Sequence, residues 1–208
     1  MSNISNAMTA GASPSFLRRY GMWLIPAIVV VSLPWLLTST VAVAVLNQMG
    51  IAVIFTVAYN MMLGQGGMLS FGHAVYFGLG GYFAIHGVNM ISDGEWPIPL
   101  PFVPLFGAFA GLAFGALFGS FSTNRAGTVF AMISLGLGEM MASSSLIFTK
   151  FSGGEEGITA DRTEALPFFG VEFTTEVQIY YLIAFWVFLA VFLMYRFSRT
   201  PIGRLANA

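Results

Sequence analysis

The polar side chains that could take part in chemistry or binding are concentrated between Asn60 and Tyr82, inside an otherwise hydrophobic stretch of the chain. Seven glycines lie among them. Glycine and polar groups at membrane depth are tolerated only where protein or a water-filled path surrounds them. A helix interrupted near 64–67 would expose backbone groups to such a path. The residues predicted to form this broken-helix path are Asn60, Gly64, Gln65, Gly67, Ser70, Gly72, His73, Tyr76, Gly78 and Gly80.

The same residues are compatible with two different roles. The amide, hydroxyl and imidazole groups can simply satisfy one another or freed carbonyls, as polar groups in membrane bundles often do. Ser70 and His73 are three residues apart and can share a helix face, which is the minimum for a nucleophile and its base. A hydrolase also needs an oxyanion site and a supply of water, and the sequence shows no second group of residues for either.

Glu139 is the one acid within a predicted membrane span. An unpaired charge at that depth is costly, so the carboxyl must be protonated, hydrogen-bonded or in contact with a hydrated cavity. Acids inside a membrane are functional candidates by default, and we include Glu139 in the predicted path. A structural partner within 143–145 or in another subunit is an equal alternative.

Glycines recur every four residues in one later segment, at Gly107, Gly111, Gly115 and Gly119. Residues with this spacing lie along one side of a helix. In lipid, such a stripe lets a second helix approach until the backbones touch. The stripe therefore predicts close helix packing, and a glycine-lined conduit is the less favoured alternative.

Composition places these segments in a membrane. Hydrophobic residues make up 57% of the 208 residues and charged residues 8%, and the mean hydropathy is +0.80. A soluble domain cannot cover its surface with so few polar residues. The chain has no cysteine, which excludes disulfides and thiolate metal sites.

The predicted fold is therefore an all-α, polytopic transmembrane helix bundle with about six spans, since a span needs ~20 apolar residues. Residues 1–20 are expected to form a disordered leader and 21–208 the membrane domain. A cleaved signal peptide is the weaker reading of the first apolar stretch, which contains Pro26 and Pro34. The third span is so rich in glycine that we expect it to be broken or re-entrant. The spans are Met22–Leu37, Val41–Leu63, Met68–Ile91, Pro99–Phe121, Ala126–Thr149 and Gln178–Tyr195.

Charge placement predicts the orientation, because Lys and Arg near spans stay in the cytoplasm. With the N-terminus inside, six of the eight basic residues are cytoplasmic: Arg18, Arg19, Arg125, Arg196, Arg199 and Arg204. Lys150 and Arg162 then lie outside, together with eight of the nine acids: Asp93, Glu95, Glu155, Glu156, Asp161, Glu164, Glu172 and Glu176.

Taken together, the motifs resemble the Liv-type permease subunits of ABC importers for branched-chain amino acids, particularly the LivM branch. The matching positions of the family signature are Asn60, Gly64, Gly67, Ser70, Gly72, His73, Ala74, Gly78, Gly80 and Tyr82, with Met61 and Tyr76 at two variable places. The run from Gly153 to Ile158 resembles the family's Gly-Gly-x-x-Gly element. Residues 198–204 resemble the start of its cytoplasmic segment that contacts the ATPase.

The resemblance implies an alternating-access path for hydrophobic amino acids in a bacterial inner membrane. It implies as partners a LivH-like second permease subunit, two cytoplasmic ATPase subunits and a periplasmic substrate-binding protein, and no nucleic acid. This chain has no Gly-x-x-x-x-Gly-Lys-Ser/Thr loop, so it is expected to bind no cofactor and to leave ATP to its partners. The expected ATPase contact consists of Arg199, Thr200, Pro201, Gly203 and Arg204.

Two alternatives remain at this level. Related permeases handle urea, short amides or other amino acids, and no residue here selects among these substrates. Family members usually continue beyond the coupling motif, whereas this sequence stops at Ala208. We therefore expect a fragment, a truncated product or a split subunit, and a membrane remnant without transport is the competing reading.

Overall fold

The computed structural model describes residues 16–37, 39–123, 127–161, 173–201 and 203. These ranges contain helices and no strand: α1 (Phe16–Leu36), α2 (Thr40–Gly66), α3 (His73–Ser92), the 3-10 turn η1 (Leu100–Phe102), α4 (Val103–Ser122), α5 (Thr128–Ile147), α6 (Thr149–Ser152) and α7 (Glu176–Ser198). Residues 1–15 of the predicted 1–20 leader, and the predictions made for Arg125, Arg162, Glu164, Glu172 and Arg204, fall outside the described residues, whereas residues 16–20 belong to α1.

The predicted all-α membrane bundle is confirmed. In the described part of the chain, four helical segments are long and apolar enough to cross a membrane: Thr40–Gly66, Leu100–Ser122, Thr128–Ile147 and Glu176–Ser198. The other two predicted spans are also helices, but they do not meet the same criteria of length and hydropathy. Among the residues described with their side chains, the apolar part of α1 is Trp23–Leu36. α3 begins at His73, five residues later than the Met68 start that we predicted.

α1 is attached to α7 at a backbone carbonyl whose helical hydrogen bond is prevented by a proline. Pro34 has no N–H group, so the Val30 carbonyl four residues earlier loses its helical donor. The Tyr180 hydroxyl of α7 donates to that oxygen at 2.7 Å, and the Tyr181 hydroxyl donates to the next carbonyl, of Val31, at 3.3 Å. The proline therefore creates the acceptor that joins the first helix to the last.

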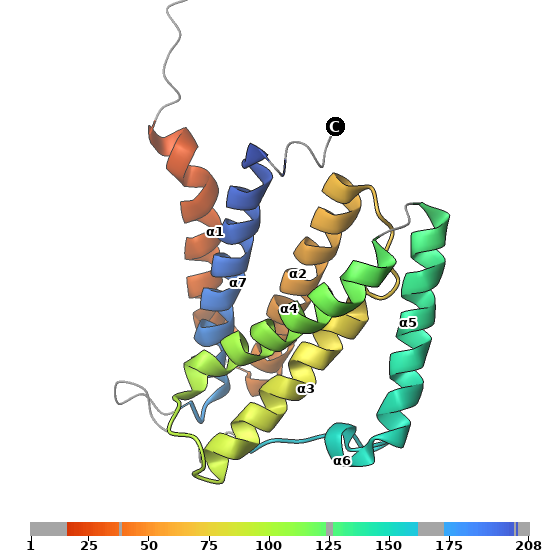
Figure 1. Cartoon of the computed structure of the whole chain (residues 1–208). Helices are drawn as coiled ribbons and strands as arrows, with labels where there is room; N and C mark the ends of the chain where they lie inside the picture. Colours follow the sequence, from red (N-terminus) through yellow and green to blue (C-terminus); the bar gives the residue numbers. More distant parts are fainter. Residues whose placement is uncertain (1–15, 38, 124–126, 162–172, 202, 204–208) are drawn as a thin grey trace, which may run out of the picture.

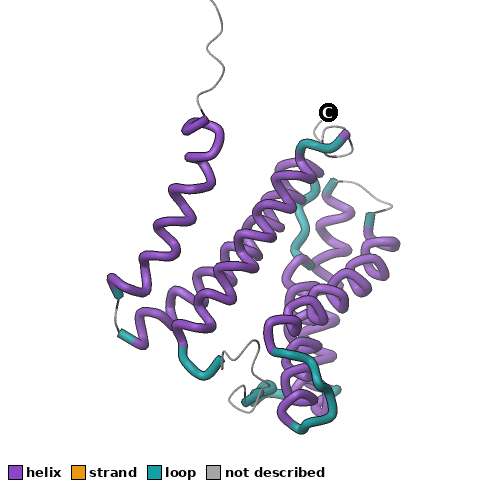
Figure 2. Tube along the Cα trace, turned by 90° about the vertical axis from the view of Figure 1, so that its left-hand side faces the viewer, coloured by secondary structure: helices purple, strands orange, loops and turns teal. Residues whose placement is uncertain are grey.

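Two closely packed helix pairs form the body of the molecule, α2 with α7 and α3 with α4. Figures 1 and 2 show the members of each pair side by side. Gly50 of α2 faces α7 so closely that a Cβ there would lie 2.7 Å from a methyl of Ile183. α5 stands at the edge of the α3–α4 pair (Figure 1), so a space remains between α5 and α3.

Candidate functional site

The link between α2 and α3 breaks the helical path inside the glycine-rich segment. Gly67 has φ = 58°, a left-handed conformation that glycine adopts without a Cβ penalty, and its N–H bonds to the Leu63 carbonyl at 3.1 Å. The backbone then leaves helical geometry until α3 begins at His73. Figure 1 shows this link turning back along the bundle before α3 starts.

Ser134 of α5 holds the end of the link. Its hydroxyl accepts a hydrogen bond from the Phe71 N–H at 3.0 Å and donates to the Ala131 carbonyl at 2.8 Å. Ser70 and Ser134 are both buried. Gly72 packs so tightly against this serine that a Cβ would lie 2.7 Å from the Ser134 carbonyl oxygen. Ser134 was not among the predicted site residues, because its only signal in the sequence is one hydroxyl within an apolar helix.

The remaining polar residues of the segment have different surroundings. The His73 ring lies between Phe55 and Tyr59, with ring centroids 5.1 and 5.8 Å away. In the part of the chain that the structure describes, no hydrogen bond joins Ser70 to His73, so the geometry gives no support to a hydrolytic pair. Asn60 is exposed, and Gln65 has a buried side-chain oxygen with no partner among the described residues.

A cavity of about 780 Å³ lies between α3, α4 and α5 and reaches the end of the α2–α3 link. Its wall is mostly aromatic, methionine or small, and it includes Phe71, Ala74, Gly78, Phe83, Gly138 and Met141. A Cβ added at Gly78 or Gly138 would meet no atom within 4 Å. These two glycines therefore widen the cavity and do not pack against a helix. The site unites the link, the first turn of α3 and the middle of α5.

Glu139 follows Gly138 on α5 but is exposed and does not line this cavity. The nearby serines have other partners: Ser144 donates to the Met141 carbonyl at 2.9 Å and Ser145 to the Ala142 carbonyl at 2.7 Å. Both bonds stay within α5. The carboxyl therefore lies on a face of α5 that no other part of the described chain covers.

The glycine stripe of α4 divides into two halves. A Cβ at Gly107 would lie 2.7 Å from the Gly80 carbonyl oxygen, and one at Gly111 would lie 3.3 Å from the Tyr76 oxygen. At Gly115 and Gly119 a Cβ would meet no atom within 4 Å. The two helices run antiparallel and α3 begins only at His73, so Gly115 and Gly119 extend beyond it. Among the described residues, Gly115 and Gly119 therefore take no part in the close packing of the stripe.

One end of the cavity is bounded by α6 and the loop after it. The His86 Nε2 and the Phe151 carbonyl oxygen are 2.8 Å apart, and the two rings stack. Gly153 has φ = 77° and lies against the Gly157 carbonyl, so this turn of the Gly-Gly-x-x-Gly element needs glycine. The Ser92 hydroxyl donates to the Asp161 carbonyl at 2.6 Å, which fastens the loop to the end of α3.

A second polar contact, which was not predicted from the sequence, joins α2 to α7. Asn47, which is 6% exposed, donates through Nδ2 to a carboxylate oxygen of Glu176 at 3.0 Å. The sequence alone places Glu176 only among the outer-side acids. A buried amide that bonds an acid fixes the register of the two helices.

A new helical turn begins directly after α7, at Pro201. The Gly203 N–H donates to the Thr200 side-chain oxygen at 3.2 Å, the geometry of an N-cap, and Pro201 occupies the first position, where its missing N–H costs nothing. Arg199 lies over the Tyr195 ring with its guanidinium carbon 4.4 Å from the centroid. The predicted coupling residues that are described therefore link the end of α7 to the start of a new helical turn capped by Thr200.

Comparisons with known proteins give consistent results. Residues 41–208 match the family described as branched-chain amino acid transport system / permease component. Two similar relatives are the high-affinity branched-chain amino acid transport system permease proteins LivM of Salmonella typhimurium strain LT2 and Escherichia coli strain K12. Each is 28% identical to this chain, over 206 and 208 residues respectively, with 88% of this chain and 47% of the relative covered. The chain thus spans about half the length of these curated relatives. No solved structure matches it.

Proposed function

Since the chain belongs to the family of branched-chain amino acid transport permease components, we propose that it acts as a LivM-type permease subunit of an ABC importer. Its substrates are branched-chain, hydrophobic amino acids. The observation that carries this proposal is the apolar cavity between α3 and α5, which lies beside the broken link from α2.

The cavity offers both kinds of contact that such a substrate needs. A branched aliphatic side chain gains from burial against Phe71, Phe83 and Met141. The first turn of α3 presents helix N–H groups beside Ala74, and such groups favour a carboxylate. The path residues of the sequence prediction therefore act here mainly through backbone geometry, and Gly72 and Gly78 permit it.

The partners are proposed from the family of the chain and from the surfaces that it exposes. ATP hydrolysis belongs to two cytoplasmic ATPase subunits, which contact the turn that begins at Thr200. A LivH-like subunit completes the path, and the open α5 face that carries Glu139 is our candidate for that contact. A periplasmic binding protein delivers substrate at the acidic loop that includes Glu155 and Glu156. Urea and short amides are less favoured substrates because the cavity wall is predominantly apolar.

We propose a bacterial inner-membrane location with the N-terminus in the cytoplasm, as the positions of Arg196 and Arg199 favour. The chain has no cysteine, so a thiol reagent labels this chain only at a cysteine that has been introduced. We expect Glu156→Cys to react with an impermeant maleimide added to intact cells, and Arg199→Cys to react only after the membrane is opened. Labelling of both from the same side would contradict this topology.

Transport itself can be tested in cells that lack their own branched-chain amino acid importers. The complete chain, expressed with its permease, ATPase and binding-protein partners, should restore uptake of radiolabelled leucine, and omission of this chain should abolish it. Excess isoleucine or valine should compete, and excess urea should not. Competition by urea alone would assign the site to the alternative substrate class.

A further inference from the structure

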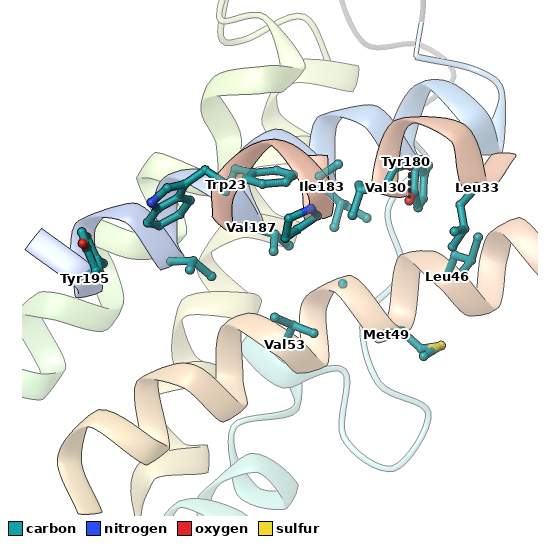
Figure 3. A pocket seen from close by; sticks show the side chains of 15 residues that line it. Trp23, Val30, Leu33, Leu46, Met49, Val53, Tyr180, Ile183, Val187 and Tyr195 are labelled. Atoms are coloured by element: carbon teal, nitrogen blue, oxygen red, sulfur yellow. Dashed lines mark hydrogen bonds between the residues drawn. The ribbon is translucent and has the colours of Figure 1, made fainter. Parts of the chain in front are cut away.

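A second hollow lies between α1, α2 and α7 and shares no lining residue with the cavity between α3 and α5. It holds about 500 Å³, and its wall is apolar along almost its whole length, with Pro26, Met49, Val53, Val187 and Val191 among its residues. Figure 3 shows side chains from all three helices arranged around this space. We call it the α1–α7 groove.

The arrangement of the three helices explains why the groove exists. At one end, the hydrogen bond from Tyr180 to the Val30 carbonyl holds α1 against α7. About one turn further along α7, Gly50 lets α2 touch α7 at Ile183. At the other end, the described contact between α1 and α7 is the edge-on packing of Trp23 against Phe192 and Tyr195, at centroid distances of 6.1 and 5.3 Å. The Trp23 ring therefore spans a gap between the backbones of α1 and α7.

The groove continues into a basic hollow at this end. This basic hollow, of about 670 Å³, shares Trp23, Phe188 and Tyr195 with the groove and is also lined by Arg196 and Arg199. Among the described residues, no acidic side chain lines either hollow. Trp and Tyr are typical of the headgroup level of a bilayer, so the two arginines lie where lipid phosphates are found.

We propose that the α1–α7 groove binds one anionic phospholipid, with its phosphate on Arg196 and Arg199 and an acyl chain along α7. The dimensions agree. From Tyr195 to Ile183 is about 18 Å at 1.5 Å per residue, close to the roughly 15 Å that half of a ~30 Å hydrocarbon core requires. The chain would thus end where Gly50 closes α2 onto α7. A protein helix in the same place would leave two arginines to be neutralised by acids of its own. The inference is independent of the proposed transport function.

The test uses the complete chain, reconstituted in phosphatidylcholine vesicles. A minor fraction of the lipid is phosphatidylglycerol that carries a photoreactive group on its acyl chain, or phosphatidylcholine with the same group. We expect the phosphatidylglycerol probe to label peptides that contain Trp23 or residues 187–195. Labelling by the phosphatidylcholine probe should be weaker by roughly thirtyfold, the effect of two basic contacts to an anionic lipid.

Three variants separate charge from fold. Arg196→Gln with Arg199→Gln should remove the preference for phosphatidylglycerol, the corresponding double Lys variant should keep most of it, and Lys150→Gln, at the opposite end of the bundle, should leave it unchanged. Equal labelling by both probes in the unaltered chain would overturn the proposal, even if a variant fails to fold. So would a photoreactive residue in place of Val53 that captures a protein helix and no lipid.

Discussion

Gly107→Ala is expected to destabilise the folded chain, whereas Gly115→Ala, eight residues along the same helix, is expected to leave it intact or slightly more stable. The new methyl at position 107 would lie 2.7 Å from the Gly80 carbonyl oxygen and 3.1 Å from the Ala84 Cβ. Two helix backbones would have to separate, and overpacking of this kind costs about 1–3 kcal/mol. The measurement is the thermal unfolding midpoint of the purified protein in detergent.

The matched variant makes the comparison sharp. At Gly115 the same methyl meets no atom within 4 Å, and replacing a helical glycine by alanine gains roughly 0.5–1 kcal/mol. The two substitutions are identical in chemistry and helix, so opposite signs report the α3–α4 contact alone. Equal midpoints for both variants would show that α4 does not pack on α3 through Gly107.

Gly72→Ala is expected to reduce the initial rate of leucine uptake by about tenfold or more, since each 1.4 kcal/mol of distortion is a factor of ten. Its methyl would lie 2.7 Å from the Ser134 carbonyl oxygen, so the α2–α3 link would be pushed away from α5. Ser134→Ala removes the side chain on α5 that takes part in the same contact. It leaves the Phe71 N–H without its acceptor, a loss of about 1–3 kcal/mol.

Gly81→Ala is the control for this pair. It lies on α3, and a Cβ there would meet no atom within 4 Å, so uptake and the amount of protein in the membrane should be unchanged. Uptake should be compared at equal membrane levels of each variant. If Gly72→Ala transports at the rate of the unaltered chain, the contact between the link and Ser134 is not part of the transport site.

The helices themselves were largely predictable, because long apolar stretches have few alternatives in a membrane. α2, α5 and α7 begin and end within three residues of the predicted spans, and α4 begins four residues later than predicted. The predicted start of α3 was wrong because Phe71 and Gly72 dock on Ser134 of α5, and no local pattern in the sequence encodes Ser134 as their partner. The break was predicted near 64–67, but α2 continues to Gly66 and the break covers 67–72, where its conformation depends on this tertiary contact.

The site was only partly visible in the sequence for the same reason. The stripe predicts four packed glycines, but Gly115 and Gly119 lie beyond the point where α3 begins, which depends on the partner helix. The bond between Asn47 and Glu176 joins residues 129 positions apart. The cavity likewise needs Gly78 and Gly138 on different helices. Each member looks ordinary in its own segment, and only the fold brings them together.

The most direct test of the transport account uses single cysteines on α5 in membranes that hold the complete transporter. Gly138→Cys lies in the wall of the cavity, and Met132→Cys lies on the same helix at an exposed apolar position outside it. We predict that a small water-soluble thiol reagent modifies Gly138→Cys, that leucine slows this reaction several-fold, and that Met132→Cys reacts slowly with or without leucine. If leucine leaves the Gly138→Cys rate unchanged, the cavity between α3 and α5 is not where the substrate passes.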